Sequence, residues 1–134
     1  MIMTCHDLHI GIMTNHLSLS QVPKVLNREL ILRKLQVMDS SLKRDFGIRM
    51  PKIAVLALNP HAGDRGLIGT EDDSIVAPAI REAFDNGILA FGPYPADGFF
   101  GNGTFREFDG VMALYHDQGL IPFKLMSFTE GVNF

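Results

Sequence analysis

Three short runs of apolar residues, each about as long as a β-strand, limit most strongly what this chain can fold into. They cover residues 8–14, 52–58 and 111–115. The run at 52–58 is continuously apolar after its first residue, without the apolar–polar alternation of a strand that has one solvated face. Strands of this kind are typical of parallel sheets, which are covered on both faces. We therefore predict three buried strands in a mostly parallel sheet.

Helical segments separate these strands. One face of the first helix is predicted by apolar residues at helical spacing, namely Ile31, Leu35, Met38, Leu42 and Phe46. Asn27 is a suitable N-cap for this helix and Gly47 a suitable stop, and Thr70 is expected to cap a second helix. A short strand at 88–91 and a turn-rich loop at 92–98 follow. Strands that alternate with helices predict an α/β fold for residues 1–134 as a single domain.

The composition excludes several classes of protein. Twelve basic residues against 15 acidic ones give a net charge of −3, which argues against a nucleic-acid or anionic-membrane surface. No run approaches the roughly 20 apolar residues of a membrane span. The single cysteine, Cys5, excludes an internal disulfide framework, and residues 1–7 lack the features of a signal peptide. We therefore expect a cytoplasmic protein. A mean hydropathy of +0.13 indicates apolar faces that other parts of an assembly cover.

Three of the five histidines occupy equivalent places in the predicted fold. His16, His61 and His116 each come just after the carboxyl end of a predicted strand. In parallel α/β sheets these ends lie along one edge, where ligands bind. Three imidazoles with an open fourth position are one arrangement of a catalytic Zn²⁺ or similar divalent ion. On the residues alone, a shared metal site and three unrelated loop histidines both remain open. His6 and His9 precede or begin a strand and are expected to be structural or exposed.

Other polar features are less specific. The glycine-rich loop at 63–70 is neither a Walker A sequence nor a dinucleotide-binding fingerprint, and it is better interpreted as a loop that positions His61. Asp117 is placed either to orient the imidazole of His116 or to cap a helix. Lys124 is a candidate contact for a phosphate or carboxylate, although a solvated surface lysine is the commoner outcome.

Five motifs, in this order and spacing, resemble those of the 4-hydroxythreonine-4-phosphate dehydrogenase family of pyridoxal phosphate biosynthesis. They are TNHL at 14–17, LNPHAG at 58–63, GPYPAD at 92–97, YHDQG at 115–119 and GVN at 131–133. The resemblance covers nearly the whole chain, although Asp64 and Asp72 stand where the family often has glutamate. Family members are considerably longer. We therefore expect residues 1–134 to be the central metal- and substrate-binding part of a larger two-lobed enzyme.

The resemblance also implies a site. The metal-binding histidines of the family match His16, His61 and His116, and two of its substrate-phosphate contacts match Lys124 and Asn133. The implied fold is a three-layer α/β/α architecture similar to one lobe of isocitrate and isopropylmalate dehydrogenases. The implied cofactors are NAD and a divalent metal (Zn, Mg or Co). The implied assembly is a homodimer with the active site at the interface, acting on a phosphorylated small molecule.

The implied reaction is the NAD-dependent oxidation of 4-phosphohydroxy-L-threonine, followed by decarboxylation. Two alternatives remain open. A related dehydrogenase of 4-phospho-threonate or 4-phospho-erythronate would carry the same motifs. A fragment that binds metal or phosphate, or that only dimerises, would carry them without catalysing hydride transfer. The sequence identifies neither the general base nor the native metal, and it does not separate NAD from NADP.

Overall fold

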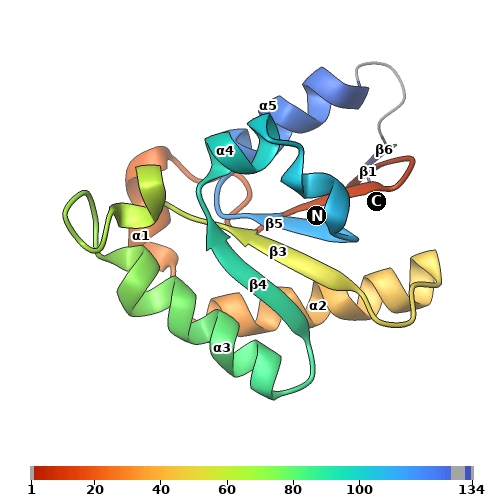
Figure 1. The fold of residues 1–134 in the computed structure, drawn as a ribbon, viewed down its shortest axis with the longest axis horizontal. Helices are drawn as coiled ribbons and strands as arrows, with labels where there is room; N and C mark the ends of the chain where they lie inside the picture. Colours follow the sequence, from red (N-terminus) through yellow and green to blue (C-terminus); the bar gives the residue numbers. More distant parts are fainter. Residues whose placement is uncertain (1, 128–131, 134) are drawn as a thin grey trace.

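The computed structural model describes residues 2–127 and 132–133, and these form a six-stranded sheet of order β4-β3-β5-β2-β1-β6 (Figure 1). The strands are β1 (Ile2–Cys5), β2 (Leu8–Ile12), β3 (Lys52–Leu56), β4 (Leu89–Tyr94), β5 (Gly110–Ala113) and β6 (Val132–Asn133). β2 pairs with β5, and β3 with β4 and β5, in parallel. β1 pairs antiparallel with β2 and with β6. The prediction of a mostly parallel sheet is confirmed.

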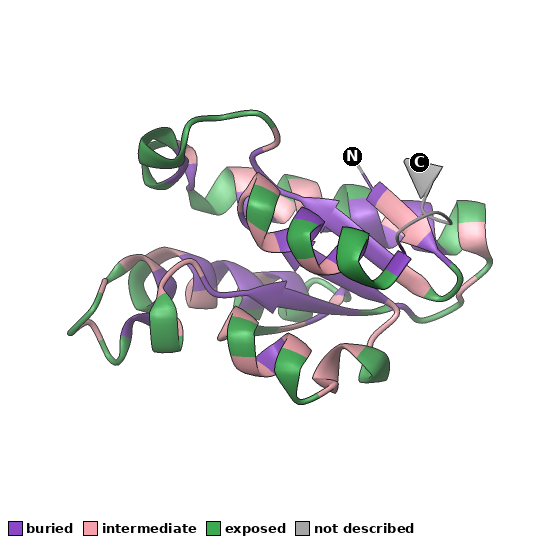
Figure 2. Ribbon diagram, turned by 90° about the horizontal axis from the view of Figure 1, so that it is seen from above, coloured by how far each residue is buried: buried purple, intermediate pink, exposed green. Residues whose placement is uncertain are grey.

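Helices cover both faces of the sheet, which confirms the predicted three-layer α/β/α architecture (Figures 1 and 2). One layer holds α2 and α3, and the other holds α4 and α5. The helices and short helical turns are η1 (Leu19–Gln21), α1 (Val22–Val25), α2 (Arg28–Phe46), η2 (Pro60–Gly63), η3 (Asp72–Val76), α3 (Ala77–Asp85), α4 (Ala96–Gly101), η4 (Thr104–Glu107) and α5 (His116–Ser127). Within the residues that the structure describes, no helix combines the length and apolar character needed to cross a membrane.

The central strands are buried on both faces, as their apolar sequences predict. In β3, Ile53 and Val55 pack into the core beneath α2 and α3, whereas Ala54 and Leu56 pack into the core beneath α4 and α5. All four side chains are fully buried. Because successive side chains of a strand point to opposite faces, one apolar run supplies both cores.

The predicted caps fix the ends of α2. The side chain of Asn27 accepts a hydrogen bond from the backbone N–H of Leu30 at 2.8 Å, and Gly47 ends the helix in the left-handed conformation at φ 69°.

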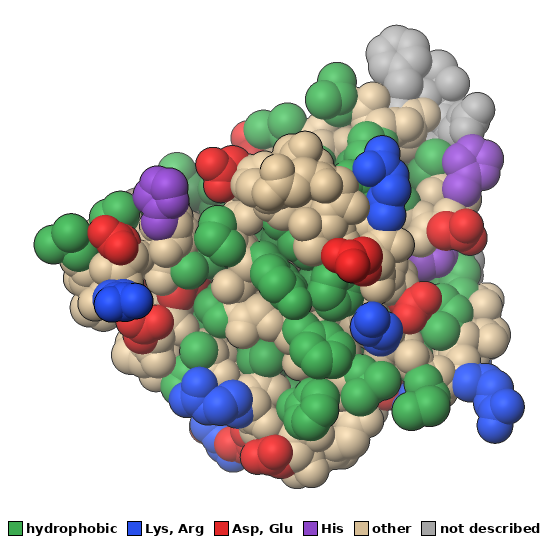
Figure 3. Space-filling model, in the orientation of Figure 1, with side chains coloured by type: hydrophobic (Ala, Val, Ile, Leu, Met, Phe, Trp, Pro, Cys, Tyr) green, Lys and Arg blue, Asp and Glu red, His purple; other side chains and the backbone are tan. Residues whose placement is uncertain are grey.

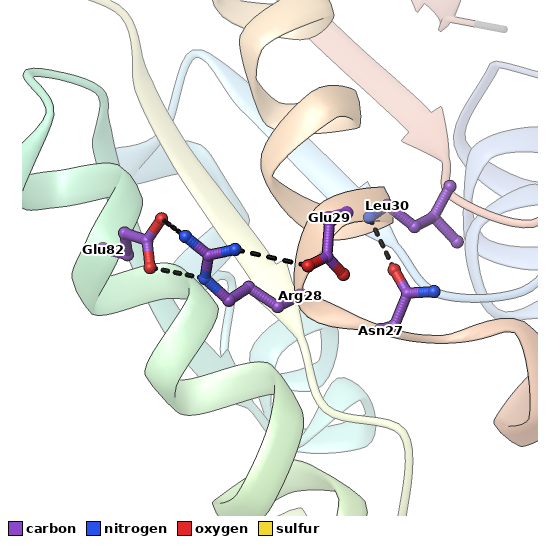
Figure 4. A network of polar contacts seen from close by, with 5 residues as sticks. All are labelled: Asn27, Arg28, Glu29, Leu30 and Glu82. Atoms are coloured by element: carbon purple, nitrogen blue, oxygen red, sulfur yellow. Dashed lines mark hydrogen bonds and ion pairs between the residues drawn. The ribbon is translucent and has the colours of Figure 1, made fainter.

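An ion pair connects α2 with α3. At the same end of α2 as Asn27, Arg28 Nε donates to Glu82 Oε1 of α3 at 2.6 Å, and Arg28 Nη2 donates to the second carboxylate oxygen of Glu82 (Figure 4). This paired contact ties the two helices of one layer together.

One prediction about local structure was wrong, and one helix was not predicted. Residues 92–98 are not one loop: β4 continues to Tyr94, whose carbonyl accepts from Ala57 N at 2.7 Å, and α4 follows from Ala96. Residues 116–127 form a helix that the sequence did not predict, because Gly119 and Pro122 both disfavour helix interiors. Gly131, the first residue of the last motif, lies outside the described residues.

Candidate active site

The loops that follow β2, β3 and β5 lie at one edge of the sheet and carry His16, His61 and His116, as predicted. The chain leaves β2 and β3 toward the layer of α2 and α3, but it leaves β5 toward the layer of α5 (Figure 1). Neighbouring strands whose connections leave on opposite faces open a crevice at their carboxyl ends, and such crevices bind ligands in α/β proteins. β5 therefore has a potential crevice on each side.

The crevice between β2 and β5 contains a pocket of about 390 Å³. Its lining comes from the segments that follow these two strands, including η1 and the first residues of α1 and α5, and consists of Asn15, His16, Leu17, Leu19, Val22, Tyr115, His116 and Asp117. The rings of His16 and His116 meet here, with centroids 5.4 Å apart and planes inclined by 40°. The fold thus brings together two of the three predicted histidines from opposite ends of the sequence.

His116 is held by its neighbour Asp117. The Nδ1 atom of His116 lies 2.8 Å from Asp117 Oδ1. Because an ionised carboxylate only accepts hydrogen bonds, Nδ1 carries the proton in this contact and the lone pair of the neutral ring lies on Nε2. A metal-binding histidine is commonly oriented by such a carboxylate. The structure therefore favours the orienting role among the two that the sequence left open for Asp117.

His61 lies in an unusual loop. The six residues 61–66 all have positive φ, between 48° and 91°, although only two of them are glycines. Gly63 is required because a Cβ atom there would lie 2.3 Å from the carbonyl oxygen of Gly69. A left-handed conformation costs a non-glycine residue roughly 1–2 kcal/mol, so other contacts must hold this loop.

A buried carboxylate holds the strand end that leads into this loop. Asp72 is fully buried and accepts from Leu58 N at 2.7 Å and from Asn59 N at 3.0 Å. The Asn59 amide also donates to Glu71 at 3.0 Å, and this hydrogen bond lowers the pKa of the Glu71 carboxyl. The strand end before His61 is thus fixed to the start of the following helix. In the sequence, Asp72 is indistinguishable from an ordinary acidic residue in a first helical turn, so its role was missed.

The structure brings two of the three predicted metal ligands together at this edge. Within the described ranges, no three histidine, cysteine, aspartate or glutamate side chains are grouped so that they could hold an ion. His16 and His116 form a pair, and the exposed His61 does not join them. Asn15 Oδ1, in the same pocket, is buried without a hydrogen-bond partner. Two imidazoles and an unpartnered amide oxygen fit a divalent ion that takes further ligands from elsewhere.

The two predicted phosphate contacts lie away from the histidine pocket, Lys124 further along α5 and Asn133 in β6. Lys124 is exposed on α5, about 12 Å along the helix from His116 at the usual rise of 1.5 Å per residue. Asn133 belongs to β6, where its backbone is in register with Met3 of β1. The side chain of Asn133 lies outside the described parts of the structure. The roles of both residues stay predictions.

Comparison with known proteins identifies the family. A family model described as "Pyridoxal phosphate biosynthetic protein PdxA" matches residues 1–134. The chain belongs to the PdxA family. One PdxA relative, the 4-hydroxythreonine-4-phosphate dehydrogenase of Bacteroides thetaiotaomicron, is 47% identical over 134 residues. That match covers 100% of this chain but only 37% of the relative.

Solved structures agree with the PdxA assignment. The crystal structure of 4-hydroxythreonine-4-phosphate dehydrogenase from Klebsiella pneumoniae superimposes with a TM-score of 0.87 at 40% identity, covering 95% of this chain and 39% of that one. A terephthalate 1,2-cis-dihydrodiol dehydrogenase from Burkholderia xenovorans superimposes with a TM-score of 0.89 at 30% identity, covering 98% of this chain and 41% of that one. The chain therefore spans about two fifths of the length of the proteins that it matches, and all three are named as dehydrogenases.

Proposed function

We propose that this chain is the metal- and substrate-binding part of a cytoplasmic enzyme that oxidises 4-phosphohydroxy-L-threonine with NAD⁺, after which the product loses CO₂. The observation that carries the proposal is the meeting of His16 and His116 in the pocket between β2 and β5. Membership of the PdxA family supports the reaction class. The ligand crevice of a parallel sheet is where such a site is expected.

The histidines hold the ion in this proposal. His16 and His116 supply two ligands through ring nitrogens, and Asp117 keeps His116 in the required orientation. When bound, a divalent ion stabilises the negative charge that develops on the substrate oxygen. His61 is exposed and apart from this pair, so we propose that it contributes where two copies of the protein meet in a homodimer.

The remaining residues hold the substrate. Leu17, Leu19 and Val22 give the pocket an apolar wall, against which the carbon chain of the substrate is proposed to pack. Lys124 and Asn133 are proposed to donate to the phosphate, the lysine as a cation and the asparagine as a neutral donor. Fixing the phosphate keeps the reacting carbon in one place relative to the nicotinamide of NAD.

The proposal is tested by NADH formation in the full-length protein that contains this chain. With 4-phosphohydroxy-L-threonine and a divalent ion, we expect NADH absorbance to rise. The substitution His116→Asn should lower kcat/KM by about 100-fold or more, because it removes a ligand rather than only an orienting group. Lack of NADH formation by the folded, metal-supplemented protein would contradict the proposed reaction.

A second candidate is a dehydrogenase of the same mechanism with a different substrate. The name of the terephthalate dihydrodiol dehydrogenase describes a substrate without a phosphate group. Its structure nevertheless superimposes on this chain as well as that of the Klebsiella enzyme does. A substrate panel that includes 4-phospho-threonate, 4-phospho-erythronate and a cis-dihydrodiol separates these possibilities. If no substrate is turned over, titration with NAD distinguishes an enzyme with an untested substrate from a fragment that only binds metal or phosphate or only dimerises.

A further inference from the structure

The second crevice beside β5 is closed by one side chain. Beyond the last paired residues of β3 and β5, Val55 and Met112, the amide of Gln118 lies between the two strand ends. Gln118 Oε1 accepts from Leu114 N at 2.8 Å, and Gln118 Nε2 donates to Ala57 O at 2.6 Å. The side-chain amide therefore takes the place of a backbone pairing where the ladder between the two strands has ended.

The contacts of Gln118 continue on both sides. Toward β2, the hydroxyl of Thr14 donates to Leu114 O at 2.7 Å. Toward the His61 loop, the residue after Ala57 donates its backbone N–H to the buried carboxylate of Asp72 at 2.7 Å. Side-chain hydrogen bonds thus connect the ends of β2, β5 and β3 in one line. Each of these strand ends leads within a few residues to one of the three histidines.

We infer that Gln118 is a positioning residue of the proposed metal-dependent reaction. By spanning the strand ends it fixes the loop of His116 relative to the loop of His61. It also fills the crevice between β3 and β5, which leaves the pocket between β2 and β5 as the place for substrate. This inference rests on the proposed function, because Gln118 can position metal ligands only if the histidines bind an ion.

The two hydrogen bonds of Gln118 have different purposes. The bond from Leu114 N is local, since a glutamine in the first turn of a helix commonly accepts from the backbone just before that helix. The bond to Ala57 O crosses to another strand and has no part in capping α5. The substitution Gln118→Glu keeps an acceptor for Leu114 N but removes the donor to Ala57 O. This variant therefore separates capping of α5 from positioning of the loops.

The test is a titration of the purified chain with Co²⁺, followed by visible absorption. We expect Gln118→Glu to weaken Co²⁺ binding by about tenfold, the lower end of the effect of removing a residue that orients a metal ligand. We also expect a change in the shape of the Co²⁺ spectrum, which a loss of stability alone does not produce. The matched control is Gln36→Glu on the exposed face of α2. This substitution should leave the Co²⁺ affinity and the shape of the Co²⁺ spectrum unchanged.

Failure of the inference and failure of the proposed function give different results. If the unaltered chain, folded and dimeric, binds no Co²⁺, the metal assignment is overturned and this inference with it. If the unaltered chain binds Co²⁺ and the Gln118→Glu variant has the same affinity and spectrum, only the inference is overturned. Should Gln118→Glu fail to fold, Gln118→Met removes both hydrogen bonds without placing a charge between the strands. The Co²⁺ affinity and the Co²⁺ spectrum of this second variant then test the inference.

Discussion

At the scale of single residues, buried polar side chains hold the edge of the sheet where the histidines lie. Asp72 is the clearest case, because its fully buried carboxylate accepts two backbone N–H groups from the strand end before His61. The substitution Asp72→Asn leaves one of these donors without an acceptor. We expect it to lower the free energy of unfolding by about 1–3 kcal/mol, measured by urea denaturation.

The neighbouring residue offers a control for this prediction. Asp73 is exposed in the same helical turn, so Asp73→Asn should change the free energy of unfolding by no more than about 0.5 kcal/mol. Equal effects of the two substitutions would show that the buried hydrogen bonds of Asp72 do not stabilise the fold.

A second residue predicts a pH dependence of stability. His9 is buried beside Phe46 and hydrogen-bonded to Thr4 Oγ1 at 2.6 Å. Burial lowers the pKa of its imidazole, although the charges of Asp7 and Asp109 act in the opposite direction. The imidazole of His9 therefore binds a proton near pH 6.5 in the unfolded chain, but only at a lower pH in the folded chain. Stability should fall as the pH drops from 7.5 to 5.5.

The measurement is the free energy of unfolding at these two pH values for the unaltered chain and for His9→Gln. The glutamine side chain does not titrate, so the variant should lose less stability than the unaltered chain between pH 7.5 and 5.5. An identical loss in both proteins would mean that His9 is not responsible for it.

Only some of these residues were predictable. The placement of His16, His61 and His116 at one edge followed from the positions of the strands alone. Asp72 and Gln118 were not found, because nothing in their local sequence distinguishes them from first-turn helix residues. Their partners lie on another element, and such pairing becomes visible only when the chain is folded.

At the scale of elements, the site depends on how closely α5 lies against the sheet. Gly119 allows this approach, since a Cβ atom there would meet Ile12 Cδ1 at 2.6 Å and Ala113 Cβ at 2.9 Å. We expect Gly119→Ala to lower the free energy of unfolding by about 1–3 kcal/mol through overpacking. The control is Gly101→Ala in α4, where an added Cβ meets nothing within 4 Å. A stabilising effect of Gly119→Ala would contradict this account of the packing.

The elements that the sequence predicted are those with a strong local signal. β2, β3, β5 and α2 combine continuous apolar runs or helical spacing with clear caps. β1 is short and was not predicted, because a strand of four residues is recognised mainly through its pairing with β2. α5 contains Gly119 and Pro122, so its helical form depends on packing against the sheet rather than on propensity.

At the scale of the whole molecule, apolar side chains remain uncovered. Hydrophobic side chains gather over β4 on the face shown in Figure 3. The rings of Phe84, Phe91 and Phe108 lie in a row, with successive centroids 5.8 and 6.1 Å apart, and Phe84 is 48% exposed. On α5, Ile121 is 64% exposed and Leu125 is 82% exposed. Surfaces of this kind commonly mark contacts with other parts of a protein or with a second copy.

We expect the chain to self-associate through α5, the helix that begins in the histidine pocket. Sedimentation velocity at increasing concentration should show a species larger than a monomer. The substitution Leu125→Lys should weaken this association without loss of core packing, because the side chain is exposed. Phe84→Lys, beside β4, is the control for a charge added to another apolar surface. A monomer at every concentration, or an effect of Phe84→Lys alone, would exclude α5 as the contact.

The central claim is that the strand-end histidines hold a divalent ion, and calorimetric titration with Zn²⁺ tests it most directly. His16→Asn and His116→Asn should each abolish or strongly weaken binding to the chain. His6→Asn should leave it unchanged, since asparagine tolerates the left-handed conformation of His6 and this residue lies in the turn between β1 and β2. Zn²⁺ binding that survives both pocket substitutions, or that is lost with His6, would contradict the claim.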